Sequence, residues 1–109
     1  MNHKKRNPCL YIIKIETEEE YFLKIGLASN GVAGRFVSSR DIPYNFSIIK
    51  TYTAPPYILW DKEAYIKQKL KQYRYVPKIK FNGHTECFNT NTLPLIEKIL
   101  NNKNTPAAR

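Results

Sequence analysis

The sequence is poor in cysteine, in acidic residues and in long apolar runs, and each shortage excludes a class of protein. Its two cysteines, Cys9 and Cys87, lie far apart, with no Cys-x-x-Cys motif and no cluster of cysteine and histidine. This spacing excludes a disulfide framework and a cysteine-based zinc site. We expect both thiols to be small buried core residues of a protein from a reducing compartment.

No apolar run approaches the length of a membrane span. The basic start of the chain precedes a short apolar run that contains a lysine, a pattern that predicts a strand behind a charged leader and not a signal peptide. We therefore expect no membrane partner. A chain of 109 residues is the size of one domain, which we place at 9–102, between a basic leader at 1–8 and a flexible tail at 103–109.

Acidic residues are scarce, since nine Asp and Glu face eighteen Lys and Arg, for a formal net charge of +9. Four of the acids gather in one short segment, at Glu16, Glu18, Glu19 and Glu20. An excess of cations suits a polyanionic partner, because neutralising phosphates releases counterions and gives strong, salt-sensitive binding. The charge favours nucleic acid as the partner, and the alternative is a basic protein kept soluble by its charge.

The apolar pattern predicts an α+β fold in the order β-β-α-β-α-β-α, with a small antiparallel sheet covered by helices. Residues 9–15 and 20–26 are rich in β-branched and aromatic side chains and indicate a β-hairpin. The other expected elements are a helix over 32–40, a strand over 46–53, a helix over 57–73, a strand over 85–88 and a helix over 93–102.

A carboxylate stands on the apolar stripe of the helix expected over 57–73. At helical spacing Glu63 falls in line with the apolar residues on either side of it. A buried carboxylate is costly unless it meets a cation, a metal or hydrogen-bond donors. Glu63 is therefore a candidate functional residue, and the alternative is a boundary residue with a surface ion pair to Lys62 or Lys67.

Two polar side chains of the expected hairpin fall on one face of the sheet. With a tight turn between Thr17 and Glu18, Tyr11 would sit directly opposite Lys24. A lysine beside a phenol stabilises the phenolate, which makes the pair a candidate for acid–base chemistry. The alternative is an ordinary core tyrosine beside a lysine whose charged head reaches solvent.

Arg35 lies on the short helix expected over 32–40. A guanidinium is planar, permanently charged and well shaped to grip a phosphate, although a surface arginine is usually only solvated. Arg35 completes a set with Tyr11, Lys24 and Glu63. Phosphodiester hydrolysis needs such a set: a base for water, a cation for the charge on the phosphate and a carboxylate for a divalent metal.

These residues, in this order and spacing, resemble the GIY-YIG endonuclease superfamily. The matching segments are Cys9-Leu-Tyr11, Lys24-Ile-Gly26, Arg35 and the helical Glu63. The ending Gly83-His-Thr-Glu86-Cys-Phe88 is similar to the Gly-x-Thr-Glu-x-Phe motif of a phage and bacterial branch. A lysine replaces the tyrosine of the second motif, which resembles some restriction-enzyme-like members.

The resemblance implies an Mg²⁺- or Mn²⁺-dependent DNA endonuclease built on a three-stranded antiparallel sheet flanked by helices. By position, Tyr11 would be the general base or would orient the attacking water, and Lys24 would occupy the place of the second tyrosine. Arg35 would stabilise the transition state, and Glu63 would be the sole metal-binding carboxylate. Such an enzyme would act in the cytoplasm of a bacterial or phage-infected cell.

Two further residues would support this site by resemblance. Glu86 would bind DNA or brace the site, with a structural hydrogen bond to a neighbouring loop as the alternative. Asn89, or Asn91 in its place, would match a late polar residue of the family. We expect sequence specificity to come from a homodimer, from the shape of the substrate or from a partner protein.

A non-catalytic nucleic-acid-binding module with the same fold is the alternative from a different class. It would bind through cations of the 57–73 helix and the loop after it: Lys67, Lys69, Lys71, Arg74, Lys78 and Lys80. Tyr73 and Tyr75 lie between them and would stack on bases. The alternative for these basic residues is a solvated face of the helix and its loop. A third candidate function for the whole protein is that of a phage-encoded antagonist that binds another protein.

Overall fold

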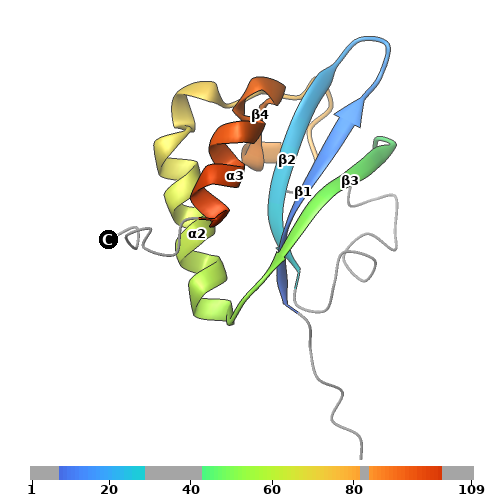
Figure 1. The fold of residues 1–109 in the computed structure, drawn as a ribbon. Helices are drawn as coiled ribbons and strands as arrows, with labels where there is room; N and C mark the ends of the chain where they lie inside the picture. Colours follow the sequence, from blue (N-terminus) through green and yellow to red (C-terminus); the bar gives the residue numbers. More distant parts are fainter. Residues whose placement is uncertain (1–7, 29–42, 82–83, 102–109) are drawn as a thin grey trace, which may run out of the picture.

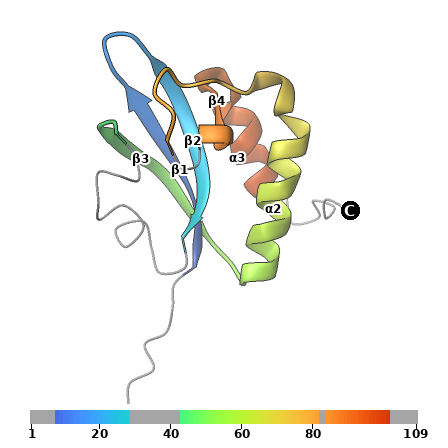
Figure 2. The same cartoon turned by 180° about the vertical axis from the view of Figure 1, so that it is seen from behind.

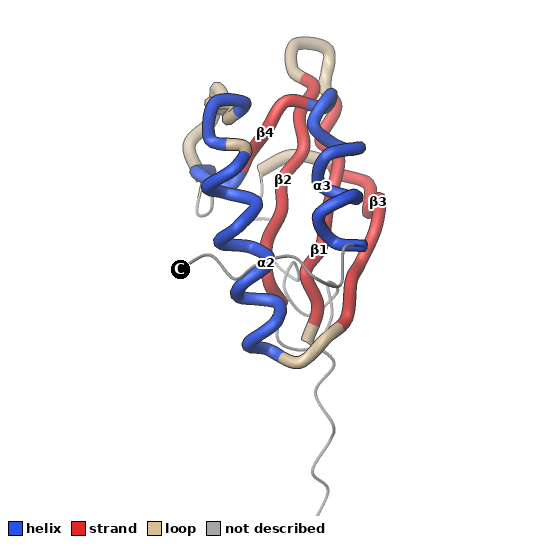
Figure 3. Tube along the Cα trace, turned by 60° about the vertical axis from the view of Figure 1, so that its left-hand side comes forward, coloured by secondary structure: helices blue, strands red, loops and turns tan. Residues whose placement is uncertain are grey.

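The computed structural model describes residues 8–28, 43–81 and 84–101. Within these ranges four strands form one antiparallel sheet in the order β3-β1-β2-β4 (Figure 1). The elements in chain order are β1 (Cys9–Glu16), β2 (Tyr21–Ala28), β3 (Phe46–Thr53), α2 (Pro56–Lys69), η1 (Lys71–Tyr73), η2 (His84–Glu86), β4 (Cys87–Asn89), η3 (Thr90–Thr92) and α3 (Leu93–Asn101). Figure 3 shows α2 and α3 side by side over one face of the sheet.

The α+β class is confirmed, but the described sheet has four strands where three were expected. The fourth strand is β4, which corresponds to the strand predicted over 85–88 and pairs with β2 at one edge of the sheet (Figure 2). The helix expected over 32–40 lies outside the described residues, and so do almost all of the expected leader and tail. In the described part of the chain, no helix is long and apolar enough to cross a membrane.

β1 and β2 form the predicted hairpin, but the expected register was wrong by two residues. Tyr11 lies opposite Gly26 and not opposite Lys24. The cause is Thr17, whose hydroxyl accepts hydrogen bonds from the backbone amides two and three residues later, at 3.0 and 2.9 Å. A shift of two residues keeps every side chain on its expected face, so Tyr11 and Lys24 share one face as predicted.

The sheet carries an apolar layer on each face. The layer under the helices joins alternate residues of β1 and β2 to α2, α3 and β4: Leu10, Ile12, Leu23, Ile25, Leu59, Ile66, Leu70, Phe88, Ile96 and Leu100. The opposite layer is built from the intervening strand residues and covering aromatic side chains: Cys9, Tyr11, Ile13, Ile15, Phe22, Ala28, Phe81 and Cys87, with Tyr44, Phe46 and Tyr75 against them. Both thiols are free and buried, as predicted.

The helix predicted over 57–73 is shorter than expected. α2 begins at Pro56, where a proline is tolerated because its missing amide would lack a helical partner in any case. It ends at Lys69, and the single turn η1 continues the chain to Tyr73. α2 turns Leu59 and Ile66 toward the sheet, which sets the direction of the polar residues on either side of that stripe.

Candidate functional site

Five side chains from β1, β2, α2 and η2 form a continuous series of polar contacts, which we call the polar ladder: Tyr11, Lys24, Glu86, Lys67 and Glu63. Lys24 Nζ donates to Tyr11 Oη at 3.0 Å and to Glu86 Oε1 at 3.2 Å. Glu86 Oε2 lies 3.1 Å from Lys67 Nζ, and Lys67 Nζ lies 3.9 Å from Glu63 Oε1. The structure thus brings three of the four predicted catalytic residues into one connected cluster.

The polar ladder runs from the protein interior to its surface. Tyr11 is fully buried and Lys24 is 1% exposed. The exposed fraction of the side chain is 16% for Glu63, 22% for Glu86 and 41% for Lys67. A ligand from solvent therefore meets the carboxylates and Lys67 first, while the phenol and the buried ammonium lie behind them.

Gly26 allows Tyr11 to lie where it does. A Cβ atom at position 26 would stand 2.5 Å from Cζ of the tyrosine ring, a distance that real Cβ contacts do not show. Lys24 Nζ lies 5.1 Å from the centre of the same ring and also donates to the carbonyl oxygen of Ile25 at 3.2 Å. The Lys24-Ile-Gly26 motif therefore supplies both the cation beside the phenol and the space for its ring.

Glu63 lies at the edge of the buried stripe of α2 and not at its centre. Burial raises the pKa of Glu63; the neighbouring carboxylate of Glu86 adds to this, whereas Lys67 and Lys24 act in the opposite direction. The pKa remains above its ordinary value, so the two lysines compensate the ionised carboxylate only in part. An additional cation beside Glu63 would lower that cost.

Glu63 and Glu86 are the carboxylates of the polar ladder that could ligate a divalent metal. Glu63 and Glu86 both contact the ammonium of Lys67, so two carboxylates face the same small volume. Mg²⁺ is commonly held by one or two carboxylates, with water and substrate phosphates completing its shell. Among residues 8–28, 43–81 and 84–101, no group of three or more His, Cys, Asp and Glu side chains could enclose a metal ion.

Other predicted site residues lie apart from the polar ladder. Arg35 falls outside the described residues. Asn89 is exposed and stands at the end of β4 opposite to Glu86, and Asn91 is exposed on η3. The structure therefore does not bring Asn89 or Asn91 to Lys24, whereas Glu86 contacts Lys24 at 3.2 Å.

The predicted basic stretch divides into cations with different surroundings. Lys71, Arg74 and Lys80 are exposed, and Lys67 belongs to the polar ladder. Lys78 is exposed and lies 3.5 Å from a carboxylate oxygen of the hairpin turn, that of Glu19. Positive charge is thus displayed along the surface that continues from α2 into the following loop.

The side chains of Tyr73 and Tyr75, the two tyrosines of that stretch, pack against core residues. Tyr75 stacks on Phe22 with a centroid separation of 4.6 Å and an interplanar angle of 13°. Tyr73 packs against the apolar layer under the helices. Stacking on a nucleic-acid base would require either ring to leave these contacts.

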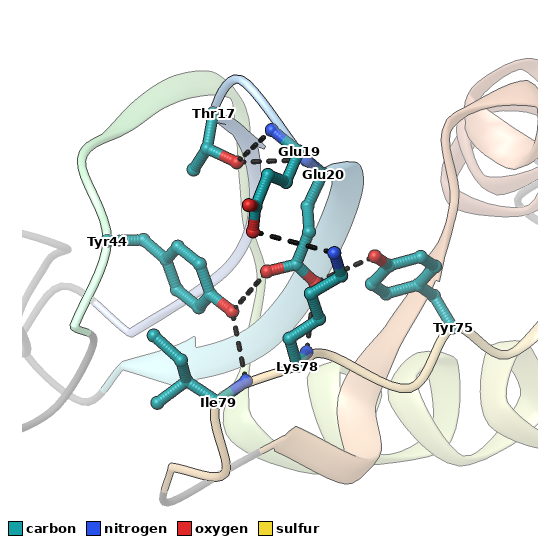
Figure 4. A network of polar contacts seen from close by, with 7 residues as sticks. All are labelled: Thr17, Glu19, Glu20, Tyr44, Tyr75, Lys78 and Ile79. Atoms are coloured by element: carbon teal, nitrogen blue, oxygen red, sulfur yellow. Dashed lines mark hydrogen bonds and ion pairs between the residues drawn. The ribbon is translucent and has the colours of Figure 1, made fainter.

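A second polar network, around Glu20, holds the basic loop in place (Figure 4). Glu20 Oε2 accepts a hydrogen bond from the Tyr44 hydroxyl at 2.7 Å. Its Oε1 accepts from the Tyr75 hydroxyl at 2.7 Å and from the backbone amide of Lys78 at 2.9 Å. Tyr44 in turn accepts from the amide of Ile79 at 3.3 Å, so one buried carboxylate joins the hairpin turn to the 75–79 segment.

Sequence reasoning missed the roles of Glu20 and Lys62. Glu20 was counted with the acids of the hairpin turn, although it is only 7% exposed. Lys62 was considered as a surface partner of Glu63, but it is buried and donates to the carbonyl oxygen of Ile99 on α3 at 2.9 Å. Desolvation lowers the pKa of Lys62, and a lysine beside the apolar stripe of α2 was the available signal.

The sequence model of the T5orf172 domain matches residues 8–103. The match includes every described strand and helix and all five members of the polar ladder. No curated protein and no solved structure matches the chain.

Proposed function

Because the chain belongs to the T5orf172 domain family, a GIY-YIG-like family associated with nucleases, we propose that it is a divalent-metal-dependent endonuclease that hydrolyses phosphodiester bonds in DNA. The polar ladder is the observation that supports this most. It brings a phenol, a buried ammonium and two carboxylates together in a basic protein. Hydrolysis of a phosphodiester uses these groups.

In this proposal Tyr11 and Lys24, at the buried end of the polar ladder, assist the removal of a proton from the attacking water. As a phenolate, Tyr11 Oη would accept a proton from the attacking water, or as a phenol it would only orient that water. The water oxygen bonds to phosphorus while the bond to the leaving oxygen breaks, and the leaving oxygen takes a proton from solvent. Lys24 Nζ, which donates to Tyr11 Oη at 3.0 Å, would stabilise the phenolate form of Tyr11 that accepts this proton. Glu86 would hold Lys24 in place through the contact at 3.2 Å.

The exposed end would hold the metal and the phosphate. Glu63 would be the principal ligand of Mg²⁺ or Mn²⁺, with Glu86 beside it; when bound, the metal supplies Lewis-acid stabilisation of the charge on the phosphate. Lys67 would release its carboxylates and contact a phosphate oxygen instead. Arg35 would contact the transferring phosphate, and a homodimer or partner protein would supply sequence specificity.

One observation favours a second candidate, a non-catalytic DNA-binding module. Tyr11 has no exposed surface, and both lysines of the ladder are already paired with Glu86. A cluster that neutralises itself in this way also serves to hold β2, η2 and α2 together. The module would bind phosphates through Lys71, Arg74 and the other exposed cations, without a reaction.

Cleavage of supercoiled plasmid, with Mg²⁺, with Mn²⁺ and with EDTA, separates the two candidates. The nuclease converts the plasmid to nicked and linear forms only when a divalent metal is present. Tyr11→Phe removes the hydroxyl and keeps the ring, so cleavage should fall by about a hundredfold or more. Tyr21→Phe removes an exposed hydroxyl elsewhere on β2 and should cut like the wild type. Retarded but uncut plasmid under every condition would identify the module.

A further inference from the structure

The outward face of α2 carries two large aromatic side chains with little cover. Trp60 is 68% exposed and Tyr57 is 67% exposed. They are three residues apart on one helix, which makes them neighbours on its surface. Tyr73 and Tyr75, in the segment after α2, instead pack against the apolar layers of the sheet.

This aromatic pair lies directly next to the polar ladder. Trp60 precedes Glu63 by three residues and Lys67 by seven, so the three side chains follow one stripe along α2. Neighbours at that spacing have Cβ atoms about 5–6 Å apart. A DNA strand whose phosphate meets Lys67 would therefore have an adjacent base within reach of the indole.

We propose that Trp60, with Tyr57 beside it, is a stacking platform for an unpaired base next to a phosphate bound at Lys67. The inference rests on the proposed nucleic-acid function and narrows its substrate class to strands with unpaired bases: single strands, flaps or branch points. Aromatic faces accept any base by stacking, whereas bases inside a duplex are already stacked on one another. The net charge of +9 and the exposed cations after α2 supply the attraction for the backbone.

The protein contains a single tryptophan, so its fluorescence reports on Trp60 alone. The experiment titrates the wild-type protein in EDTA with oligo-dT of about 20 nucleotides, longer than a typical single-strand site, and with a blunt duplex of equal length. We expect the oligo-dT to quench the tryptophan emission and the duplex to leave it nearly unchanged. Binding is followed in parallel by the anisotropy of a labelled oligonucleotide.

Substitutions then test whether the indole contributes affinity. Trp60→Ala should weaken oligo-dT binding by about 5- to 150-fold, the range expected for one stacked base, and should change duplex binding by less than about twofold. Trp60→Phe retains an aromatic face and should recover most of the loss. Tyr21→Ala removes a comparably exposed ring, 51% exposed, at the start of β2 and outside α2, and should bind like the wild type.

Three outcomes would overturn the inference: unchanged emission at saturating oligo-dT, equal quenching by the blunt duplex, or unaltered affinity of Trp60→Ala. If Trp60→Ala changed only the oligomeric state seen by light scattering, Trp60 would instead be a protein interface. The measurement is independent of cleavage because it is made in EDTA. Quenching by a protein that never cuts would support the platform and refute the nuclease, and cutting without quenching would do the reverse.

Discussion

The Glu20 network makes a quantitative prediction about stability. Glu20 accepts two hydrogen bonds from tyrosine hydroxyls at 2.7 Å and one from a backbone amide at 2.9 Å. In Glu20→Gln the amide oxygen can keep the two donors on one side, but the amide nitrogen then faces the Tyr44 hydroxyl, which loses its acceptor. A hydrogen bond to a charged group contributes about 1.5–3 kcal/mol. We therefore expect Glu20→Gln to lower the free energy of unfolding by about 2 kcal/mol, which lowers Tm by roughly 10 °C in a domain of this size.

The stability lost in Glu20→Gln should be larger at neutral pH than in acid. Burial alone would raise the pKa of Glu20, but the hydrogen bonds from Tyr44, the Lys78 amide and Tyr75 outweigh it, so the pKa lies below its ordinary value. A carboxyl with a depressed pKa in the folded state stabilises the protein above its unfolded pKa, and this contribution is lost as the pH falls through the folded pKa. Wild type and Glu20→Gln should differ most near pH 7 and converge in acid.

Thermal denaturation of the wild type, Glu20→Gln and Glu19→Gln at pH 7 and at acid pH tests this directly. Glu19→Gln removes the same charge from the preceding residue, whose side chain is 73% exposed and lies 3.5 Å from Lys78. An exposed ion pair of this kind contributes little, so this variant should melt close to the wild type. Equal Tm values for Glu20→Gln and Glu19→Gln at pH 7 would refute the reasoning.

Three other predictions concern the ladder and the basic surface. Gly26→Ala should destabilise the fold by about 1–3 kcal/mol, because its Cβ must displace the tyrosine ring packed against it; urea denaturation with no loss would contradict this contact. Lys24→Met and Glu86→Gln should be non-additive by about 0.5–3 kcal/mol in a double-mutant cycle, and simple additivity would mean that the 3.2 Å contact carries no energy. Lys71→Gln and Arg74→Gln should each reduce the slope of log K against log[salt] for DNA binding by about 1, and unchanged slopes would remove these exposed cations from the interface.

The composition of each short segment predicted the strands of the sheet, because β-branched and aromatic side chains are enriched in strands. The strands at 46–53 and 9–15 follow from their β-branched and aromatic composition, and β3 has the predicted bounds. The hairpin register depended on one side chain, since the Thr17 hydroxyl binds two backbone amides of the turn. A shift of two residues changes the register but leaves each side chain on the same face of the sheet. Tyr11 and Lys24 were therefore correctly predicted to share a face.

The residues that sequence reasoning missed are those whose roles depend on distant partners. Glu20 meets one tyrosine 24 residues away and another 55 residues away. Lys62 meets the carbonyl oxygen of Ile99, 37 residues away, and a helix or strand pattern cannot predict such a contact. Glu63 was singled out because a carboxylate on an apolar stripe is a local anomaly, and the structure places it at the edge of that stripe, 3.9 Å from Lys67.

The central claim, that the exposed end of the polar ladder is a metal-dependent nuclease site, is tested most directly by single-turnover DNA cleavage with Glu63→Gln. Glu18→Gln is the matched control, because it removes the same charge from an exposed position in the hairpin turn. We predict that Glu63→Gln binds DNA as well as or slightly better than the wild type. Its cleavage in Mg²⁺ or Mn²⁺ should fall by at least about a hundredfold, while Glu18→Gln cuts normally. Equal cleavage by the wild type and Glu63→Gln would contradict the assignment of this site.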